Sequence, residues 1–482
     1  MKKESGVTLI TLIIAIIILI ILAGIGFNAA LGEGGILDQS KQAKEEYEYA
    51  QGVEGDGVNK AQGILTDILA ENNGPAVKNP REEIAGDGSY IKVNDVKANS
   101  PKLAEGMEAI VMNPDGSDRP ATSEEDWYDY STNKWANAKT TEDGSFWVWI
   151  PRYEYKIDYT GVPQNGSGDH TKAGTIDIRF IDASTKTGAT GYTTTNGITT
   201  KSDGYIIHPA FTNDSGNGYA NGGWDSEIPG FWVAKYEMSM ENGSGTHVAT
   251  SSGTIGNVAL STSVKAVSKP GVSSWRNINI ANCYQNAYNY DTSREKESHL
   301  MKNSEWGAVA YLTHSQYGRN GIEITINNSS TYITGNAGNI VSAGSATGIT
   351  NAYNTIAGAL ASSTGNMSGI YDLSGGANEY VAAYNKAYSG TYFTGTSYKN
   401  AEGTHFASTG GSSTKYVTTY SNSTGTYYAT NLSDFTSGGR DVSHTGDAIH
   451  EVWIKTDYGW LSDYSNFVTS DHPFFRRGRS LQ

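Results

Sequence analysis

Cysteine is almost missing from this chain, because Cys283 is the only one in 482 residues. A single cysteine excludes an internal disulfide, a cysteine-based zinc cluster and a two-cysteine catalytic pair within one chain. Basic residues are also scarce: 35 Lys and Arg stand against 50 Asp and Glu, which gives a net charge of −15. This balance argues against a groove for nucleic-acid phosphates. The nine histidines are scattered and form no His-x-His or HExxH pattern, so a histidine metal site is not indicated.

Long apolar runs are missing after residue 30, whereas the chain starts with one. Residues 7–27 read VTLITLIIAIIILIILAGIGF and carry no charge. About 20 such residues at about 1.5 Å rise each form a helix of roughly 30 Å, the thickness of a bilayer's hydrocarbon core. A transmembrane helix is therefore predicted. Because Lys2 and Lys3 are the only basic residues near its start, we expect a single-pass cell-membrane protein whose large domain is extracellular.

Three interpretations compete for this N-terminal segment. A cleaved secretory signal has a shorter apolar core and a small-x-small exit, which the sequence lacks. A plain anchor explains the length of the run. The third is more specific, because KKESG at residues 2–6 followed by VTLI resembles a type IV prepilin leader. The resemblance implies cleavage by prepilin peptidase between Gly6 and Val7, N-methylation, and assembly with other pilin-like subunits. Thr11 departs from the family, which carries Glu there, and this leaves entry into a polymer open.

Composition divides the rest of the chain into segments. Residues 38–51 read DQSKQAKEEYEYAQ, a run of strong helix formers that continues the anchor as a stalk. Beyond the stalk, Gly, Ser, Thr, Asn and Tyr mixed with β-branched residues predict strands joined by long polar loops. The fold class is thus α+β, with a long N-terminal pilin-like helix before a β-rich domain. The expected segments are a leader at 1–6, an anchor helix and stalk at 7–51, a helical linker at 52–88, a small β subdomain at 89–142 and a main domain at 143–482.

Several local patterns predict individual elements. Trp127 and Trp135 are expected to pack across an aromatic hairpin at 127–136 rather than to bind a ligand. Ser304 is expected to cap a helix at 298–312. Residues 320–366 and 386–448 are rich in Ser, Thr, Gly and Tyr, so they should be surface elaborations or disordered. The other expected elements are a strand at 106–112 with a turn at 113–116, a strand at 146–151, a helix at 280–290 and a glycine turn within 369–381 that feeds a strand.

Six sequence blocks, in their order along the chain, resemble the formylglycine-generating-enzyme-like branch of the C-type lectin fold. The resemblance covers about residues 143–480, and it implies a C-type-lectin-like domain. It also leads us to expect a chain truncated at its C-terminus, since the family's last strands are missing. The blocks are FWVWIP at Phe146, KYEMS at Lys235, PGVSSW at Pro270, HLMKNSEWGAVA at His299, GIYDLSGGANEYV at Gly369 and FRRGRS at Phe475.

The same resemblance implies a calcium site in the glycine turn. In the family, side chains at the positions of Asp372 and Glu379 bind Ca²⁺, together with carbonyls at those of Gly375 and Ala377. Such oxygens are the ligands that a hard cation prefers. The alternative is a tight turn whose carboxylates cap backbone N–H groups. The family's catalytic cysteine pair has no counterpart after Cys283, so we do not expect an enzyme.

Three functional classes follow from these observations. The favoured one is a cell-surface or pilus-associated, minor-pilin-like protein that displays a non-catalytic lectin-like domain for adhesion or ligand recognition. Its surface ligand, carbohydrate or protein, is not identified by the sequence, and no nucleic acid is expected. The alternative is a structural subunit of a type II secretion or type IV pilus-like machine, and the least favoured is a formylglycine-generating oxidase. His299 and Glu305 are expected to pack and cap, and the arginines at 476, 477 and 479 to make fold contacts.

Overall fold

The computed structural model describes sixteen parts of the chain. Contacts divide the chain into two units, Met1–Lys78 and Asn79–Gln482. The first unit lies outside the described residues, so the leader cleavage at Gly6 and Val7, the anchor helix and the stalk remain predictions. No helix within the described ranges combines the length and apolar character needed to cross a bilayer. The described residues are 84–158, 175–186, 192–195, 198–217, 219, 222–242, 264–276, 278, 280–293, 295–322, 324–327, 332–338, 350–385, 415–420, 446–448 and 474–478.

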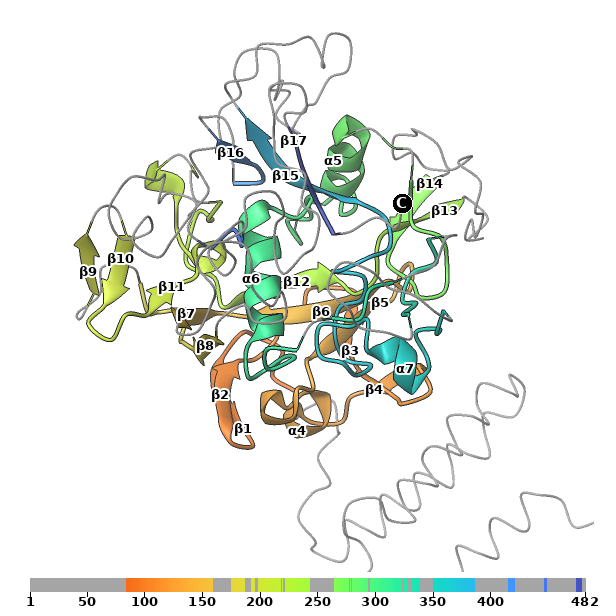
Figure 1. Ribbon diagram of the computed structural model, residues 1–482, viewed down its shortest axis with the longest axis horizontal. Coiled ribbons are helices and arrows are strands. Elements are labelled where there is room, and N and C mark those ends of the chain that lie inside the picture. Colours follow the sequence, from red (N-terminus) through yellow and green to blue (C-terminus); the bar gives the residue numbers. More distant parts are fainter. Residues whose placement is uncertain are drawn as a thin grey trace, which may run out of the picture. The chain divides into compact units, whose positions relative to one another are not determined.

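The second unit is rich in β-strands and has few helices, as the composition predicted (Figure 1). Its strands are β1 Tyr90–Val93, β2 Val96–Asn99, β3 Met107–Met112, β4 Asp118–Pro120, β5 Asn137–Thr140, β6 Phe146–Pro151, β7 Tyr153–Asp158, β8 Thr175–Phe180, β9 Tyr192–Thr195, β10 Ile198–Lys201, β11 Ile206–Ile207, β12 Gly230–Ala234, β13 Ser239–Asn242, β14 Val264–Val267, β15 Glu379–Asn385, β16 Thr418–Tyr420 and β17 Phe474–Arg477. Its helices are α4 Glu124–Trp127, α5 Ile280–Tyr288, α6 Asn303–His314 and α7 Ile356–Ala359, with 3₁₀ turns η2 Tyr130–Thr132, η3 Pro209–Phe211 and η4 Ser215–Asn217.

The largest sheet has the strand order β12-β6-β5-β3-β4 and is antiparallel throughout. The predicted strand at 146–151 is confirmed as β6, in which Val148 and Ile150 are fully buried. Trp149 pairs with Trp232 of β12, and their rings lie edge to face at 5.2 Å. Strands β3 to β5 come from the expected subdomain, and β6 and β12 from the expected main domain. The sheet therefore continues across residue 142, where a boundary between the small β subdomain and the main domain was expected.

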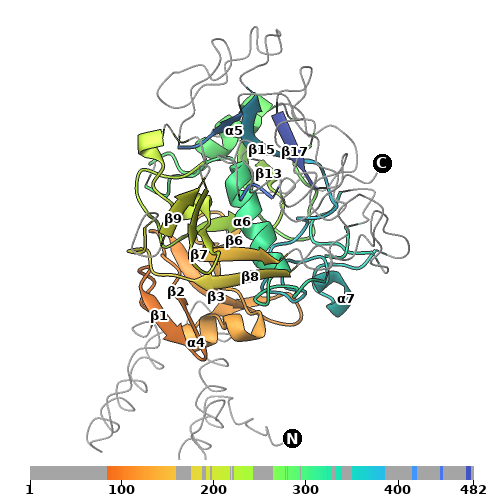
Figure 2. The same cartoon turned by 60° about the vertical axis from the view of Figure 1, so that its left-hand side comes forward.

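A second sheet, β11-β7-β8, lies beside the helix α6 (Figure 2). Strand β8 alternates strictly, because Ile176, Ile178 and Phe180 are buried whereas Asp177 and Arg179 are exposed. A period of two is the pattern of a strand with one face on the core and one in water. The outer face of this sheet is therefore charged.

Helix α6 is the central helix of the described fold, and all of its residues are buried. It contacts strand β8 of one sheet and strand β15 of another, and Figures 1 and 2 show it between these two sheets. A helix covered on every side is apolar or small over most of its surface, and its buried polar residues, such as Asn303 and Glu305, need partners within the fold. A Cβ atom on Gly307 would lie 1.9 Å from the carbonyl oxygen of Gly446, so glycine is required where the 446–448 segment crosses the helix.

A third sheet, β16-β15-β17, collects the C-terminal strands, with β16 parallel and β17 antiparallel to β15. Arg477 at the end of β17 is fully buried and donates to the Asn303 side chain at 2.8 Å, and to the carbonyls of Asp447 and Ala448. Its guanidinium carbon also lies 4.4 Å from the ring centroid of Trp306. The prediction that this arginine makes fold contacts is confirmed.

Three local predictions are wrong. Residues 320–366 were expected at the surface or disordered, but their described parts include the helix α7 and contribute Ile324 and Ala361 to the buried core.

The other two concern the aromatic stretch and a helix cap. The stretch at 127–136 does not form the expected aromatic hairpin: α4 ends at Trp127, and the η2 turn is closed by a single antiparallel bridge between Asp129 and Lys134. Both tryptophans of that stretch are nevertheless buried, so packing rather than a ligand platform is confirmed. The predicted helix at 298–312 begins only at Asn303, which places Ser304 inside it. Glu305 fills the capping role instead, by accepting the backbone N–H of Lys302 at 2.8 Å.

Candidate functional site

The predicted calcium turn places Asp372 at a buried, strained corner. Asp372 has a φ of 66° and no solvent exposure. One carboxylate oxygen accepts the Asn327 side-chain amide at 2.9 Å, and the other accepts the backbone N–H of Gly335 at 2.7 Å. Burial raises the pKa of Asp372 to about 7, although these donors oppose the shift. In the described structure, this carboxylate caps backbone and amide donors, as the alternative interpretation expected.

The two glycines of the turn adopt the conformation for which they were singled out. Gly375 and Gly376 have φ values of 90° and 65°, a region that glycine reaches without a Cβ penalty. The turn aims backbone carbonyls at Gly478, just after β17. A Cβ atom added to Gly478 would lie 3.7 Å from the carbonyl oxygens of both Gly375 and Ala377, and 3.8 Å from that of Leu373. The two carbonyls predicted as ligands therefore converge on a space that a side chain at 478 would fill.

A third acid, Glu237, joins this turn and was missed at the sequence level. It is 9% exposed, and one of its carboxylate oxygens accepts the backbone N–H of Ala377 at 2.8 Å. Burial raises the pKa of Glu237, and the nearby charges of Asp372 and Glu379 raise it further. Glu237 belongs to the KYEMS block that carried the resemblance, but no local pattern connects that block with the turn. Glu379 itself opens β15, opposite Arg477.

The donor set around this turn fits a hard cation in part. The second carboxylate oxygen of Glu237 is buried and has no hydrogen-bond partner among the described residues. An orphaned carboxylate oxygen and converging carbonyls are the chemistry that Ca²⁺ takes up. Within the described ranges, however, no three His, Cys, Asp or Glu residues are grouped closely enough to hold a metal by side chains alone. If the turn holds Ca²⁺, Glu237 and the carbonyls of Gly375 and Ala377 are its best donors.

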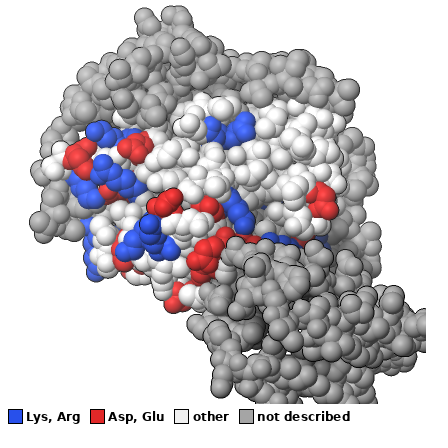
Figure 3. Space-filling view, turned by 90° about the horizontal axis from the view of Figure 1, so that it is seen from below, with Lys and Arg blue, Asp and Glu red and all other residues white. Residues whose placement is uncertain are grey.

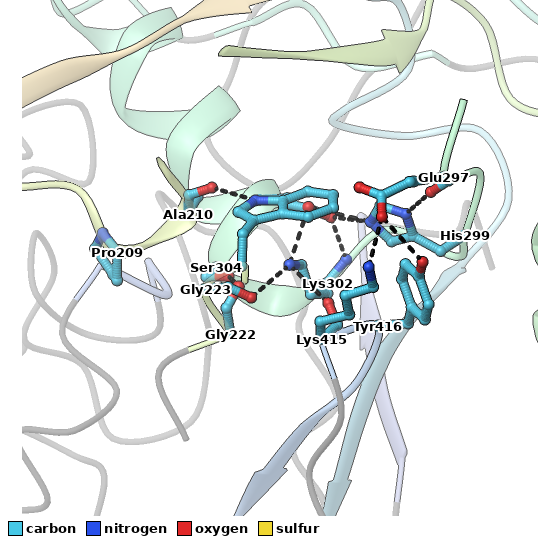
Figure 4. Close-up of polar contacts among 12 residues, drawn as sticks. Pro209, Ala210, Gly222, Gly223, Glu297, His299, Lys302, Ser304, Lys415 and Tyr416 are labelled. Carbon is cyan, nitrogen blue, oxygen red and sulfur yellow. Dashed lines mark hydrogen bonds and ion pairs between the residues drawn. The ribbon is translucent and has the colours of Figure 1, made fainter. Parts of the chain in front are cut away.

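A second buried polar cluster surrounds Lys302, immediately before α6 (Figure 4). The Lys302 ammonium donates to the carbonyls of Gly223 and Lys415 at 3.3 and 3.0 Å, and lies 3.4 Å from the Glu305 carboxylate. It also sits 3.9 Å from the centre of the Trp224 ring, a cation–π contact. This one side chain therefore joins three distant stretches of the chain.

The charges of this cluster are balanced internally. His299 contacts both carboxylate oxygens of Glu305 at 3.1 Å. Burial alone would raise the pKa of Glu305, but the charges of Lys302 and His299 and their hydrogen bonds lower it to about 2. Lys415 forms ion pairs with Glu297 and Asp225 at 2.5 and 2.8 Å at the rim. The expected packing and capping role of His299 and Glu305 is confirmed. The cluster as a whole stabilises the fold.

Burial keeps two further titratable groups in their uncharged forms. Burial raises the pKa of the Cys283 thiol in α5 to about 12, so it stays protonated. Burial lowers the pKa of His208 to about 3, among the rings of Tyr153, Tyr155 and Phe211. The face in Figure 3 carries basic and acidic groups side by side, without a large patch of one sign. A phosphate-binding surface therefore has no support on that face.

The chain was also compared with known proteins. No protein-family model matches it, and no curated protein is similar to it.

Proposed function

We propose that this chain is a membrane-anchored surface protein whose β-rich domain is a non-catalytic, C-type-lectin-like binding module. A pilin-like N-terminus carries the module, and prepilin peptidase processes it. The Ser-, Thr-, Gly- and Tyr-rich segments 386–414 and 421–445 carry recognition. The support for this proposal comes from where these two segments begin and end.

Both segments are attached to the same fastened part of the fold. Segment 386–414 follows β15 in the chain and ends just before Lys415, whose backbone carbonyl accepts a hydrogen bond from the Lys302 ammonium. Segment 421–445 leaves β16 and returns at Gly446, which packs on Gly307 and precedes the carbonyls held by Arg477. The C-terminal end of each segment is thus tied to the buried helix α6 or to the residue before it. Many folds position their recognition loops by attaching them at both ends to a rigid scaffold.

The composition of the two segments supports the same role. They consist mostly of Ser, Thr, Gly, Tyr and Asn. Tyr offers a large contact area at low entropic cost, while Ser, Gly and Asn give adaptable hydrogen bonding, and binding loops of antibodies use this mixture. The C-type-lectin-like assignment rests on the sequence blocks, of which FWVWIP, HLMKNSEWGAVA and FRRGRS contribute to β6, α6 and β17.

The test compares cells that display the full-length protein with cells that lack it. Both are scored for retention on panels of immobilised glycans and extracellular proteins. Replacing 386–414 with a Gly-Ser linker of equal length should abolish the retention that the protein confers, because the scaffold stays while the contact residues are lost. The matched control replaces 243–263, which joins β13 to β14 in another sheet. Equal retention of both cell types on every surface would overturn the proposal and favour a machine subunit instead.

A further inference from the structure

A groove of about 540 Å³ lies beside β8, the edge strand of the β11-β7-β8 sheet. Its charged side chains are Lys156 of β7, Asp177 and Arg179 of β8, and Asp203 of the turn before β11. The buried side chain of Ile176 adds an apolar part to the lining. Ligand sites commonly measure about 300–1,000 Å³, so the groove has room for a small molecule that is both charged and partly apolar.

Two of the four charged groups in the groove are left over. Arg179 and Asp203 form an ion pair with each other at 2.6 Å. Lys156 and Asp177 are direct cross-strand partners in β7 and β8, yet neither forms an ion pair with the other or with any other described residue. One ammonium and one carboxylate therefore stay available, and a ligand that carries both charges binds them without breaking an existing ion pair.

Hydrogen bonds fix these two charged groups separately. Asp177 accepts the Tyr205 hydroxyl and, at 3.2 Å, the Gln316 side-chain amide. The Lys156 ammonium donates to the backbone carbonyl of Asp203 at 3.0 Å. A carboxylate has about four acceptor positions and an ammonium three donors, so each group keeps about two positions for a ligand. Both groups are thus oriented in advance, which lowers the entropic cost of binding.

The spacing of the two free charges limits the length of the ligand. Lys156 and Asp177 occupy opposed positions, and the Cα atoms of such an antiparallel pair lie about 4.5–5.5 Å apart. An α-amino acid carries its ammonium and its carboxylate on one carbon, whereas a peptide adds about 3.3–3.6 Å between them for each further residue. The lining therefore matches a free amino acid better than a peptide. An apolar side chain on that amino acid would cover Ile176.

From these observations we propose that the groove binds a free α-amino acid with an apolar side chain. The ligand's ammonium pairs with Asp177, its carboxylate pairs with Lys156, and its side chain lies against Ile176. Tyr205 and Gln316 are positioning residues, because they act through Asp177. The proposal goes beyond the proposed binding function, since it concerns a small molecule and a sheet other than β16-β15-β17.

The test titrates the full-length protein, in an uncharged detergent near neutral pH, with three ligands that differ only in charge. The probes are L-leucine, leucinamide, which lacks the carboxylate, and N-acetyl-leucine, which lacks the ammonium. Binding is measured by saturation-transfer NMR. Because exposed ion pairs are individually weak, we expect leucine to bind in the millimolar range and each derivative to bind about fivefold more weakly. Glycine, which has no apolar side chain, should bind about tenfold more weakly than leucine.

Two variants connect each charge of the ligand with its partner. Lys156→Gln should weaken the binding of leucine and N-acetyl-leucine about fivefold and leave leucinamide unchanged. Asp177→Asn should weaken leucine and leucinamide by the same factor and leave N-acetyl-leucine unchanged. Equal melting temperatures confirm that both variants fold. The matched controls are Lys92→Gln on β1 and Glu142→Gln, which change exposed charges away from the groove and should bind all three ligands as the parent does.

Absence of leucine binding would overturn the proposal, as would affinities that do not follow the charge pattern of the two groove variants. The peptide leucyl-glycyl-glycine carries the same two charges farther apart. If it bound more tightly than leucine, the groove would belong to an extended peptide and the proposal would be wrong. The retention test of the proposed function replaces 386–414 and leaves the groove intact, so either result can fail while the other stands.

Discussion

Arg477 lies over the indole ring of Trp306, with its guanidinium carbon 4.4 Å from the ring centroid, and both side chains are fully buried. The contact joins the last described strand to the central helix. It also fixes the 446–448 segment, whose carbonyls accept from the same guanidinium. One cation in the core thus holds together three stretches that are far apart in the sequence.

Arg477→Ala should therefore destabilise the folded unit strongly. The substitution removes the cation–π contact and leaves buried carbonyl oxygens without a donor, each at about 1–3 kcal/mol, so we expect a loss of at least about 3 kcal/mol. The measurement is urea unfolding of the full-length protein followed by tryptophan fluorescence. Arg119→Ala is the control, because that arginine pairs with Asp126 at 2.6 Å but is 36% exposed, and it should cost less than about 1 kcal/mol. Similar losses in the two variants would show that Arg477 is not a fastening point.

The buried carboxylate of Glu305 should make stability depend on acid. Its pKa falls from 4.5 to about 2 on folding, so its contribution is present above about pH 4.5 and is lost as the pH falls toward 2. Glu305→Gln should lower the unfolding free energy near neutral pH, because Lys302 then keeps a buried charge without its carboxylate. Urea unfolding at neutral pH and at about pH 3 should show that the difference in unfolding free energy between parent and variant is smaller in acid. A difference of the same size at both pH values would mean that the pKa of this carboxylate does not change on folding.

The strand at 146–151 could be predicted from the sequence because its signal is local, an aromatic and β-branched run that ends at Pro151. Strand β8 also has a local signal, the alternation of buried and exposed residues, but it was missed because the surrounding 157–205 stretch is rich in Thr and Gly and has the composition of a loop. The hairpin prediction for the 127–136 stretch failed for another reason. Its tryptophans suggested a hairpin, but Ser123 accepts the N–H of Asp126 and begins α4, and this cap was overlooked.

The candidate site could be predicted only where the backbone dictated it. Gly375 and Gly376 predicted a turn with positive φ values, and both residues have them in the structure. Glu237 could not be placed there, because it reaches the turn across 140 positions of sequence to meet Ala377. The partners of Lys302 are likewise assembled by tertiary packing from residues 223, 305 and 415. Such contacts leave no periodicity in the sequence.

The N-terminus gives a prediction that is independent of the folded unit. If KKESG is a prepilin leader, the mature chain begins at Val7 and carries an N-methyl group. Mass spectrometry of the membrane-associated protein, from cells with an active prepilin peptidase, measures this directly. A Gly6→Arg variant should keep its leader, since the peptidase would lose its cleavage site, and it serves as the comparison. Recovery of an intact Met1 end, or of a cut near residue 26, from the parent protein would leave a plain anchor or a secretory signal.

The acids around the glycine turn give the last prediction. Folding raises the pKa of Asp372 to about 7 and raises that of Glu237 as well, so the folded state binds more protons than the unfolded chain in mildly acidic solution. Stability should therefore fall as the pH rises from about 4 to about 7, the opposite sign to Glu305. A cation that neutralises these carboxylates would remove the penalty. We expect millimolar calcium to raise the melting temperature of the full-length protein, and to do so more at about pH 8 than at about pH 5.

Because calcium would bind only the folded state, the corresponding gain in unfolding free energy is about 2.7 kcal/mol at a hundredfold excess over Kd. Glu237→Gln should remove most of it, because that variant keeps the bond to the Ala377 N–H but loses the charge beside the orphaned oxygen. Asp372→Ala and Glu379→Ala should remove it too if the full set predicted from the resemblance binds the ion. Asp126→Asn, an acid bound to Arg119 away from the turn, should leave the calcium response unchanged. Melting curves that coincide in calcium and in chelator at both pH values would identify these carboxylates as caps of backbone N–H groups and nothing more.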